Sequence, residues 1–146
     1  MFGLLWAALG TMSLHAETAT VRGYWLEPTG SIIRIAPCGP RLCANLVALP
    51  TGPHPSTDLN NPNRSLRERP LCGLRIGEGF IEHDPAHADG GYLYDPKSGR
   101  TYRGSMSSDG DHLRLRGYVG LKLFGRTETW TRVHDAPRRC GGEPHS

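Results

Sequence analysis

Turn signals recur at short intervals along this chain of 146 residues, roughly every eight to twelve residues, and they separate short apolar runs. The stretches "EPTG", "PCGPRL", "YDPKSGRTY" and "SSDGDH" each place Pro, Asp or Gly where a chain reversal needs a preset or positive φ. Helical periodicity is almost absent. The sequence therefore predicts an antiparallel all-β domain built from consecutive hairpins.

We expect about eight strands, at residues 21–27, 31–36, 42–49, 74–76 with 79–82, 91–94, 101–107, 112–120 and 126–133. Side chains alternate between the two faces of a strand. In 112–120 this places one set toward the core (Leu113, Leu115, Gly117, Val119) and one set outward (Arg114, Arg116, Tyr118). In 126–133 it separates Thr127, Thr129, Thr131 and Val133 from Glu128, Trp130 and Arg132.

One helical element is expected, in the segment "TGPHPSTDLNNPNRSLRERPLCG". Asn61 is a suitable N-cap and Pro62 suits the first helical position, so a short helical turn should run to Leu66. Pro70 should end it.

Residues 1–16, "MFGLLWAALGTMSLHA", are apolar and uncharged, which is typical of a signal peptide. A membrane anchor is the alternative, but the apolar run is shorter than the roughly 20 residues that a spanning helix needs. We expect residues 17–133 to form the barrel domain and 134–146 a polar C-terminal tail. The protein would then be periplasmic or secreted.

Four cysteines in a small exported chain predict disulfides. Of the three possible connectivities we favour Cys38 with Cys43, across a hairpin turn, and Cys72 with Cys140, between mid-chain and tail. A zinc site is the alternative, but the paired short Cys spacings are missing.

Charge and motifs exclude several classes of function. The 17 Lys and Arg exceed the 14 Asp and Glu only slightly and form no dense patch, which argues against a nucleic-acid partner. No nucleophile elbow, phosphate loop or metalloprotease motif occurs. We therefore expect neither catalysis nor a cofactor, although a hydrolase stays as a third hypothesis.

Two polar stretches resemble metal sites only loosely. Asx turns and a helix cap explain the four oxygen-bearing residues of "DLNNPN" better than calcium does, because the EF-hand pattern is missing (Asp58, Asn60, Asn61, Asn63). His83 and His87 have a metal-like spacing, but Pro85 argues against a helix that would align them. We expect a solvated loop there, and no metal site.

The two ends of the domain carry a matching pair. "RGYW" opens the first expected strand and "TWTRV" closes the last, and these strands are neighbours in a closed barrel. Arg132 could then stack on the indole of Trp25 and bond main-chain carbonyls. Gly23, Trp25 and Arg132 resemble the signature of the lipocalin and calycin superfamily; the alternative is a partly buried Trp in a β-sandwich.

The chain also resembles the bacterial exported DUF2147 family. The matching stretches lie between Gly23 and Val133 and are "GYWLEPTGSIIRIAPCG", "LCANLVAL", "TDLNNPNRSLRERPLCGL", "YDPKSGRTYRGSM" and "LRLRGYVGLKLFGRTETWTRV". The resemblance implies an extracytoplasmic, lipocalin-like, up-and-down antiparallel β-barrel of about eight strands. It implies no established activity.

Candidate binding residues fall in "RGYVGLKLFGRTETW": Tyr118, Leu121, Leu123, Phe124 and Arg126. The apolar members would lie at the barrel rim, either lining a pocket entrance or folded back as a plug. Arg126 could receive an anionic head group or pair across strands. We expect a small apolar or amphipathic ligand in the interior; the alternative is a filled barrel that contacts an envelope protein through 121–124 and "NNPNRSLRERP".

Overall fold

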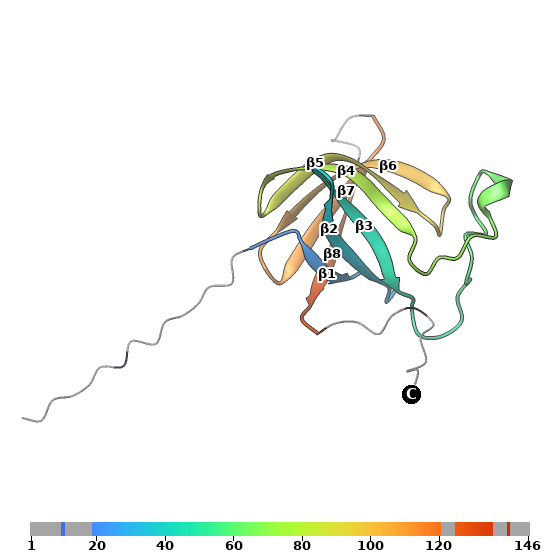
Figure 1. Ribbon diagram of the computed structural model, residues 1–146, viewed down its shortest axis with the longest axis horizontal. Coiled ribbons are helices and arrows are strands. Elements are labelled where there is room, and N and C mark those ends of the chain that lie inside the picture. Colours follow the sequence, from blue (N-terminus) through green and yellow to red (C-terminus); the bar gives the residue numbers. More distant parts are fainter. Residues whose placement is uncertain (1–9, 11–18, 121–124, 136–139, 141–146) are drawn as a thin grey trace, which may run out of the picture.

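Eight antiparallel strands follow one another in chain order and close into a barrel, in a computed structural model that describes residues 10, 19–120, 125–135 and 140 (Figure 1). The last strand bonds to the first, with Trp25 opposite Arg132. The all-β, up-and-down barrel that the sequence predicts is confirmed. The strands are β1 (Gly23–Leu26), β2 (Ile32–Cys38), β3 (Arg41–Ala48), β4 (Arg75–Asp84), β5 (His87–Asp95), β6 (Arg100–Ser108), β7 (His112–Tyr118) and β8 (Arg126–Val133).

The largest difference from the expected strands lies in the β4–β5 hairpin. β4 is one strand where two pieces were predicted, and β5 begins at His87, so the expected solvated loop is wrong. Pro85 and Ala86 are the turn between the strands. His83 and His87 are exposed strand residues, and each pairs with a carboxylate, at 2.6 Å to Asp89 and 2.9 Å to Asp84.

The helical element is shorter and starts later than predicted. A 3-10 turn, η1 (Arg64–Leu66), has Asn63 as its N-cap, whose side chain accepts from the amide of Ser65 at 3.1 Å. Asn61, the predicted cap, accepts from the amide of Asn63 and donates to Asp58 instead. Asn61 therefore fixes the loop that contains η1 but does not cap the helix.

Alternation along β7 holds until the strand ends. Leu113 and Leu115 are buried as expected, but Tyr118 is 6% exposed and Val119 is 71% exposed, the reverse of the prediction. The strand ends at Tyr118, so period-two alternation no longer applies to Val119. The segment entering β8 covers Tyr118: a Cβ placed on Gly125 would lie 2.9 Å from the Cβ of Tyr118.

One end of the barrel, which we call the closed end, carries the β2–β3, β4–β5 and β6–β7 turns. Residues 19–22 run across it, and the amide of Val21 donates to the carbonyl of Pro85 at 2.8 Å. The buried core of this half includes Val21, Trp25, Ile35, Leu42, Ala44, Phe80, Ala88, Met106 and Leu113.

Phe80 fills the middle of the barrel because two strands beside it carry glycine. A Cβ on Gly91 would lie 2.5 Å from the ring of Phe80, and one on Gly104 would lie 3.0 Å from it. No side chain larger than hydrogen fits at Gly91. The Phe80 ring is fully buried, so the barrel is solid from the closed end up to this layer.

The predicted contact between Trp25 and Arg132 is present at the closed end. The guanidinium carbon of Arg132 lies 4.1 Å from the ring centre of Trp25, which is fully buried. The same guanidinium donates to the carbonyls of Thr20, at 2.6 Å, and Arg22, at 3.0 Å, and to that of Gly110. One side chain therefore joins the N-terminal segment, the β6–β7 turn and β8.

Gly23 is part of this arrangement for a steric reason. Its φ is +125°, a conformation that side chains disfavour. A Cβ at this position would also lie 2.6 Å from Nη1 of Arg132. The glycine of the Gly-x-Trp triplet is thus the space through which the guanidinium reaches the carbonyl of Arg22.

One of the two expected disulfides is formed. Cys38 and Cys43 are bonded across the β2–β3 turn. Cys72 and Cys140 are free thiols, so the second predicted pairing is wrong for this structure, although the residues are neighbours: Sγ of Cys72 donates to the carbonyl of Cys140 at 3.3 Å. Burial, and then the hydrogen bond with Cys72, raise the pKa of Cys140 to about 11.

Predictions about the chain ends stay predictions. Residues 1–9 and 11–18, which include most of the expected signal peptide, lie outside the described residues, as do 136–139 and 141–146 of the expected tail. In the described part of the chain, no helix is long and apolar enough to span a bilayer.

Candidate ligand-binding site

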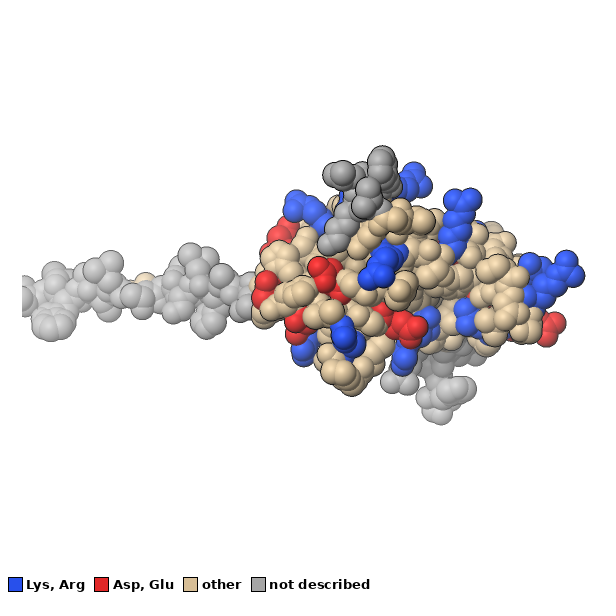
Figure 2. Space-filling model, turned by 90° about the horizontal axis from the view of Figure 1, so that it is seen from above, with Lys and Arg blue, Asp and Glu red and all other residues tan. Residues whose placement is uncertain are grey.

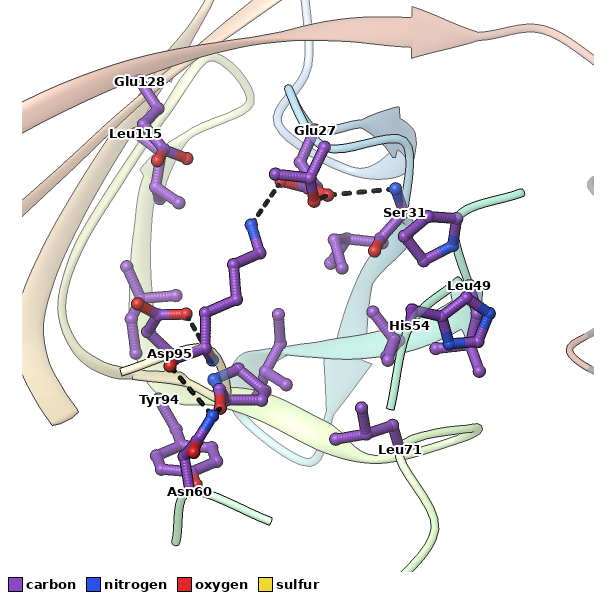
Figure 3. A pocket seen from close by; sticks show the side chains of 18 of the residues that line it. Glu27, Ser31, Leu49, His54, Asn60, Leu71, Tyr94, Asp95, Leu115 and Glu128 are labelled. Atoms are coloured by element: carbon purple, nitrogen blue, oxygen red, sulfur yellow. Dashed lines mark hydrogen bonds and ion pairs between the residues drawn. The ribbon is translucent and has the colours of Figure 1, made fainter. Parts of the chain in front are cut away.

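The half of the barrel opposite the closed end is hollow. A cavity of about 550 Å³ lies between the strands and opens to solvent at this end, which we call the open end (Figure 3). Its inner walls are apolar and come from six strands: Ile33, Leu46, Ile76, Leu93, Leu115 and Trp130. Inward-facing positions of these strands alternate with outward ones, so the walls follow directly from the strand pattern.

A buried carboxylate, that of Glu27, stands at the mouth of the cavity where β1 ends. Glu27 is 7% exposed, and its carboxylate accepts from the amide of Ser31 at 3.0 Å and from the hydroxyl of Thr29. Burial alone would raise the pKa of Glu27, but these hydrogen bonds outweigh burial and lower it. Glu27 is therefore charged at neutral pH.

The charge of Glu27 is balanced from the other side of the mouth. Nζ of Lys97, in the β5–β6 turn, lies 3.2 Å from Oε2 of Glu27. Asp95 shapes this turn by accepting from the amide of Lys97 at 3.0 Å and from Ser98 at 2.8 Å. The Lys97 side chain thus spans the mouth and divides it.

Two further charged side chains enter the cavity from β8. Glu128 accepts from Nε1 of Trp130 at 3.0 Å, which satisfies the indole inside the wall. Arg126 lines the rim, two residues earlier on the same face. Within the described part of the chain, the guanidinium of Arg126 makes no hydrogen bond or ion pair, so it is available to a bound group.

The remaining wall is the loop between β3 and β4, which lies beside the cavity and carries η1. His54, Pro55, Thr57, Asn60 and Leu71 of this loop line the cavity. The loop is pinned to the β5–β6 turn, because Nδ2 of Asn60 donates to the carbonyl of Lys97 at 3.0 Å. A Cβ on Gly99 would lie only 2.0 Å from the carbonyl oxygen of Asn60, so only glycine permits this approach.

Asp58 anchors the loop from inside. Its carboxylate is fully buried and accepts from the hydroxyl of Tyr94 at 2.6 Å, from Asn61 at 2.8 Å and from Nε of Arg69 at 2.9 Å. Burial alone would raise the pKa of Asp58, but these three donors lower it. Burial, and then the bond to Asp58, raise the pKa of Tyr94 to about 12.

The structure brings only part of the predicted binding set to the cavity. Arg126 lines it, whereas Tyr118 is buried outside its lining. Leu121, Leu123 and Phe124 lie outside the described residues. Gly23, Trp25 and Arg132 are at the opposite, closed end, where they support the barrel and do not line the cavity.

Sequence reasoning missed Glu27, Lys97 and Asp58 as parts of the site. Glu27 and Lys97 were assigned only to the turns "EPTG" and "YDPKSGRTY", and Asp58 to an Asx turn. Glu128 carried a usable signal, because the alternation of "GRTETWTRV" already placed this carboxylate on the same face as Trp130. A charged residue on the core face of a strand indicates a cavity or a partner.

No metal site emerges from the described residues: they contain no group of three or more His, Cys, Asp and Glu side chains arranged to hold an ion. His83 and His87 are on the outer surface of the β4–β5 hairpin, away from the cavity. Among the histidines that the structure describes, His54 alone lines the cavity.

The sequence matches a family model. The model described as "Uncharacterized protein conserved in bacteria (DUF2147)" covers residues 23–132. The match thus begins at Gly23 and ends at Arg132, the residues that meet at the closed end. No curated protein matches the chain significantly.

The fold matches a solved structure. The protein HP1028 of Helicobacter pylori, described as belonging to the lipocalin family, superposes with a TM-score of 0.73 at 22% sequence identity. The superposition covers 81% of this chain and 86% of that chain. At this identity the likeness shows the fold alone, and it confirms the predicted lipocalin-like barrel.

Proposed function

This chain belongs to the DUF2147 family, and we propose that it binds one small apolar or amphipathic molecule in the hollow half of its barrel. The observation that carries the proposal is the open cavity of about 550 Å³ with six apolar walls. Ligand sites are concave, mostly apolar and about 300–1,000 Å³ in volume, with a few polar groups that fix orientation. The cavity has each of these properties.

Amphipathic ligands fit the distribution of polarity in the cavity. An apolar group would lie among Leu93, Leu115 and Trp130, and a polar group would meet the charged residues of the mouth. Two Lys or Arg side chains line the cavity: Lys97 is already paired with Glu27, whereas Arg126 has no side-chain partner among the described residues. We therefore assign the contact with an anionic head group to Arg126.

Binding without turnover is the activity we propose. Glu27, the most buried carboxylate of the cavity, has a lowered pKa and is charged at neutral pH, so it is not suited to act as a general acid. The proposed setting is extracytoplasmic, either periplasmic or secreted, which agrees with the disulfide between Cys38 and Cys43. A filled barrel that acts only through protein contacts is the second candidate, and the cavity disfavours it.

Two fluorescent probes test the proposal: the neutral N-phenyl-1-naphthylamine and the anionic 1-anilinonaphthalene-8-sulfonate. We expect saturable binding of one probe per protein, and native mass spectrometry of the protein from envelope extract should show an apolar adduct. Leu115→Trp fills the cavity and should weaken both probes at least about tenfold, because a buried ring displaces the ligand. Arg114→Trp, one residue away on the outer face, is the matched control.

Arg126→Gln separates the two ends of the ligand. It should weaken the anionic probe by about three- to tenfold and leave the neutral probe unchanged, because only the former loses a charge-assisted contact. If Leu115→Trp binds both probes as the unmodified protein does, the probes are not in the barrel and the proposed function fails.

A further inference from the structure

We propose that the open end of the barrel is a docking surface for an anionic phospholipid bilayer, with the loop at residues 57–70 as its main contact. The docking surface does not depend on the ligand cavity. It concerns the partner that the mouth faces, whereas the proposed function concerns a small molecule inside the barrel. Four observations lead to it: exposed apolar side chains, their position, nearby cations and a rigid scaffold.

Exposed apolar side chains gather at the open end. Six large apolar residues are exposed in the described part of the chain. Ile81 and Tyr92 lie on the barrel wall. The other four surround the mouth, on the 57–70 loop, at the end of β1 and after β7, with exposed fractions of 56%, 37%, 41% and 71% (Leu59, Leu66, Leu26, Val119). Clustered exposed apolar groups mark contact surfaces.

Cations accompany these apolar groups. Arg64 and Arg67 are on the same loop as Leu59 and Leu66, and Arg100 follows the β5–β6 turn to which the loop is pinned. Figure 2 shows Lys and Arg side chains projecting at the end of the molecule that carries η1. Of the acidic side chains at this end, those of Glu27 and Asp58 are buried and paired with Lys97 and Arg69.

The opposite end carries several exposed carboxylates in its turns, although Arg41 and Arg132 also lie at this end. Asp84, Asp109 and Asp111 lie in or beside the turns of the closed end, and Glu82 is paired with Arg22 at 2.7 Å. An anionic surface would repel these carboxylates and attract the arginines of the 57–70 loop, which favours contact through the open end. Three carboxylates at the open end oppose the attraction, that of Glu68 on the loop and those of Asp95 and Glu128 at the mouth.

The loop is held in a single shape before any contact. The buried Asp58 carboxylate ties residues 61 and 69 to Tyr94, and an isolated bridge pairs Thr57 with Pro70 at the base of the loop. Burying a carboxylate has a large desolvation cost, which its three hydrogen-bond donors must offset. Such an arrangement in a surface loop indicates that the shape of the loop matters. A preformed apolar tip loses little entropy on docking.

A bilayer accounts for the combination better than a protein partner does. Interfacial segments combine apolar side chains with Lys or Arg, and each cation near an anionic surface strengthens binding about fivefold. Two or three arginines with two leucines give weak, reversible and salt-dependent attachment. Docking in this way places the cavity mouth at the lipid surface.

The test is sedimentation of the full chain with sucrose-loaded vesicles. We expect binding to vesicles of about three parts phosphatidylcholine to one part phosphatidylglycerol at low ionic strength, and much less binding in high salt or to pure phosphatidylcholine. Leu59→Ser with Leu66→Ser should weaken binding at least about tenfold, and Arg64→Gln with Arg100→Gln about tenfold or more.

Matched controls use equally exposed residues elsewhere, in the same chain, so that any contribution of residues 1–16 is common to all. They are Ile81→Ser with Tyr92→Ser on the wall and Arg34→Gln with Arg41→Gln away from the mouth. Absence of binding to anionic vesicles, or equal losses in test and control pairs, overturns the proposal. Loop variants that still bind both fluorescent probes show that such a failure leaves the ligand cavity untouched.

If the double leucine variant instead loses a stoichiometric protein partner while vesicle binding is absent throughout, the surface is a protein interface and the bilayer is rejected.

Discussion

Arg132 holds the closed end of the barrel through contacts that no other side chain can make together. Its guanidinium stacks on Trp25 and donates to three carbonyls, two of them in the N-terminal segment and one in the β6–β7 turn. Lysine carries the same charge, but its point-like ammonium cannot stack as a plane and donate in a fork.

We expect Arg132→Ala to lower the free energy of unfolding by about 2–4 kcal/mol, the sum expected for a desolvated cation–π contact and charged hydrogen bonds. Arg132→Lys should recover less than half of that loss. Urea denaturation of both variants measures it, with Arg34→Ala, an exposed arginine of β2, as the control. A lysine variant as stable as the unmodified protein would show that charge alone, and not the planar fork, matters here.

Single residues were predictable where their chemistry is unusual for their place in the chain. Gly23, Trp25 and Arg132 form a pattern at fixed strand positions, and Cys38 and Cys43 flank a turn. Glu27 and Asp58 look like ordinary turn residues, because the sequence does not show that a distant Lys97 or Tyr94 will bury them. Burial of a polar residue is decided by tertiary contacts, not by local pattern.

At the scale of elements, the 57–70 loop depends on one carboxylate, that of Asp58. Because the pKa of Asp58 is lowered in the folded protein, its charged form stabilises the loop. That stabilisation is present above the unfolded pKa of about 3.9 and is lost as pH falls through the still lower folded value. The loop should therefore loosen only in strong acid.

We expect Asp58→Asn to destabilise the protein by about 2–4 kcal/mol at neutral pH, because Arg69 and Tyr94 lose their charged acceptor. The gap between the variant and the unmodified protein should narrow as pH falls below about 4. Unfolding free energies measured from pH 7 to pH 3 check this. The control is Glu68→Gln, which replaces an exposed carboxylate of the same loop. A gap that does not change with pH would mean that Asp58 acts by shape and not by charge.

Strands were predicted better than the segments between them. All eight appear, because each has its own alternating pattern and flanking turn residues. The β4–β5 hairpin was misjudged because His83, Asp84 and His87 are polar, although a two-residue turn needs no apolar content. The cap of η1 moved from Asn61 to Asn63 because the two asparagines have equal local preference, and the buried Asp58 recruits the first.

On the scale of the whole molecule, the barrel has a packed half and a hollow half. Phe80 lies in the packed half, surrounded by glycines and core side chains, whereas Leu115 lines the cavity. Removing atoms from a packed site leaves a new void, whereas removing them from a cavity wall enlarges an existing one.

We expect Phe80→Ala to lower the free energy of unfolding by about 3–5 kcal/mol and Leu115→Ala by only about 1–2 kcal/mol. Chemical denaturation of the two variants measures this difference, and Leu113→Ala, on the same strand but in the packed half, should lose more than Leu115→Ala. Equal losses of unfolding free energy at positions 113 and 115 would mean that the half of the barrel at the open end is packed as tightly as the half at the closed end.

The sequence could not foretell this division. An eight-stranded barrel is just wide enough to be filled by side chains or to hold one small ligand. Which of the two occurs depends on how the side chains of all eight strands meet inside the barrel. Here they fill the barrel from the closed end as far as the ring of Phe80, and the cavity lies beyond that ring. The closed barrel itself was predictable from its two ends, but the position of its floor was not.

Because the packed half and the hollow half of the barrel are separate, side chains in the hollow half can change without disturbing the packed half. The core between the closed end and Phe80 stabilises the barrel. The cavity walls can therefore accept larger, smaller or more polar side chains while the fold stays the same. Under the proposed ligand-binding function, relatives that share the closed-end architecture therefore need not share a ligand, and a redesigned lining would change the specificity without changing the fold.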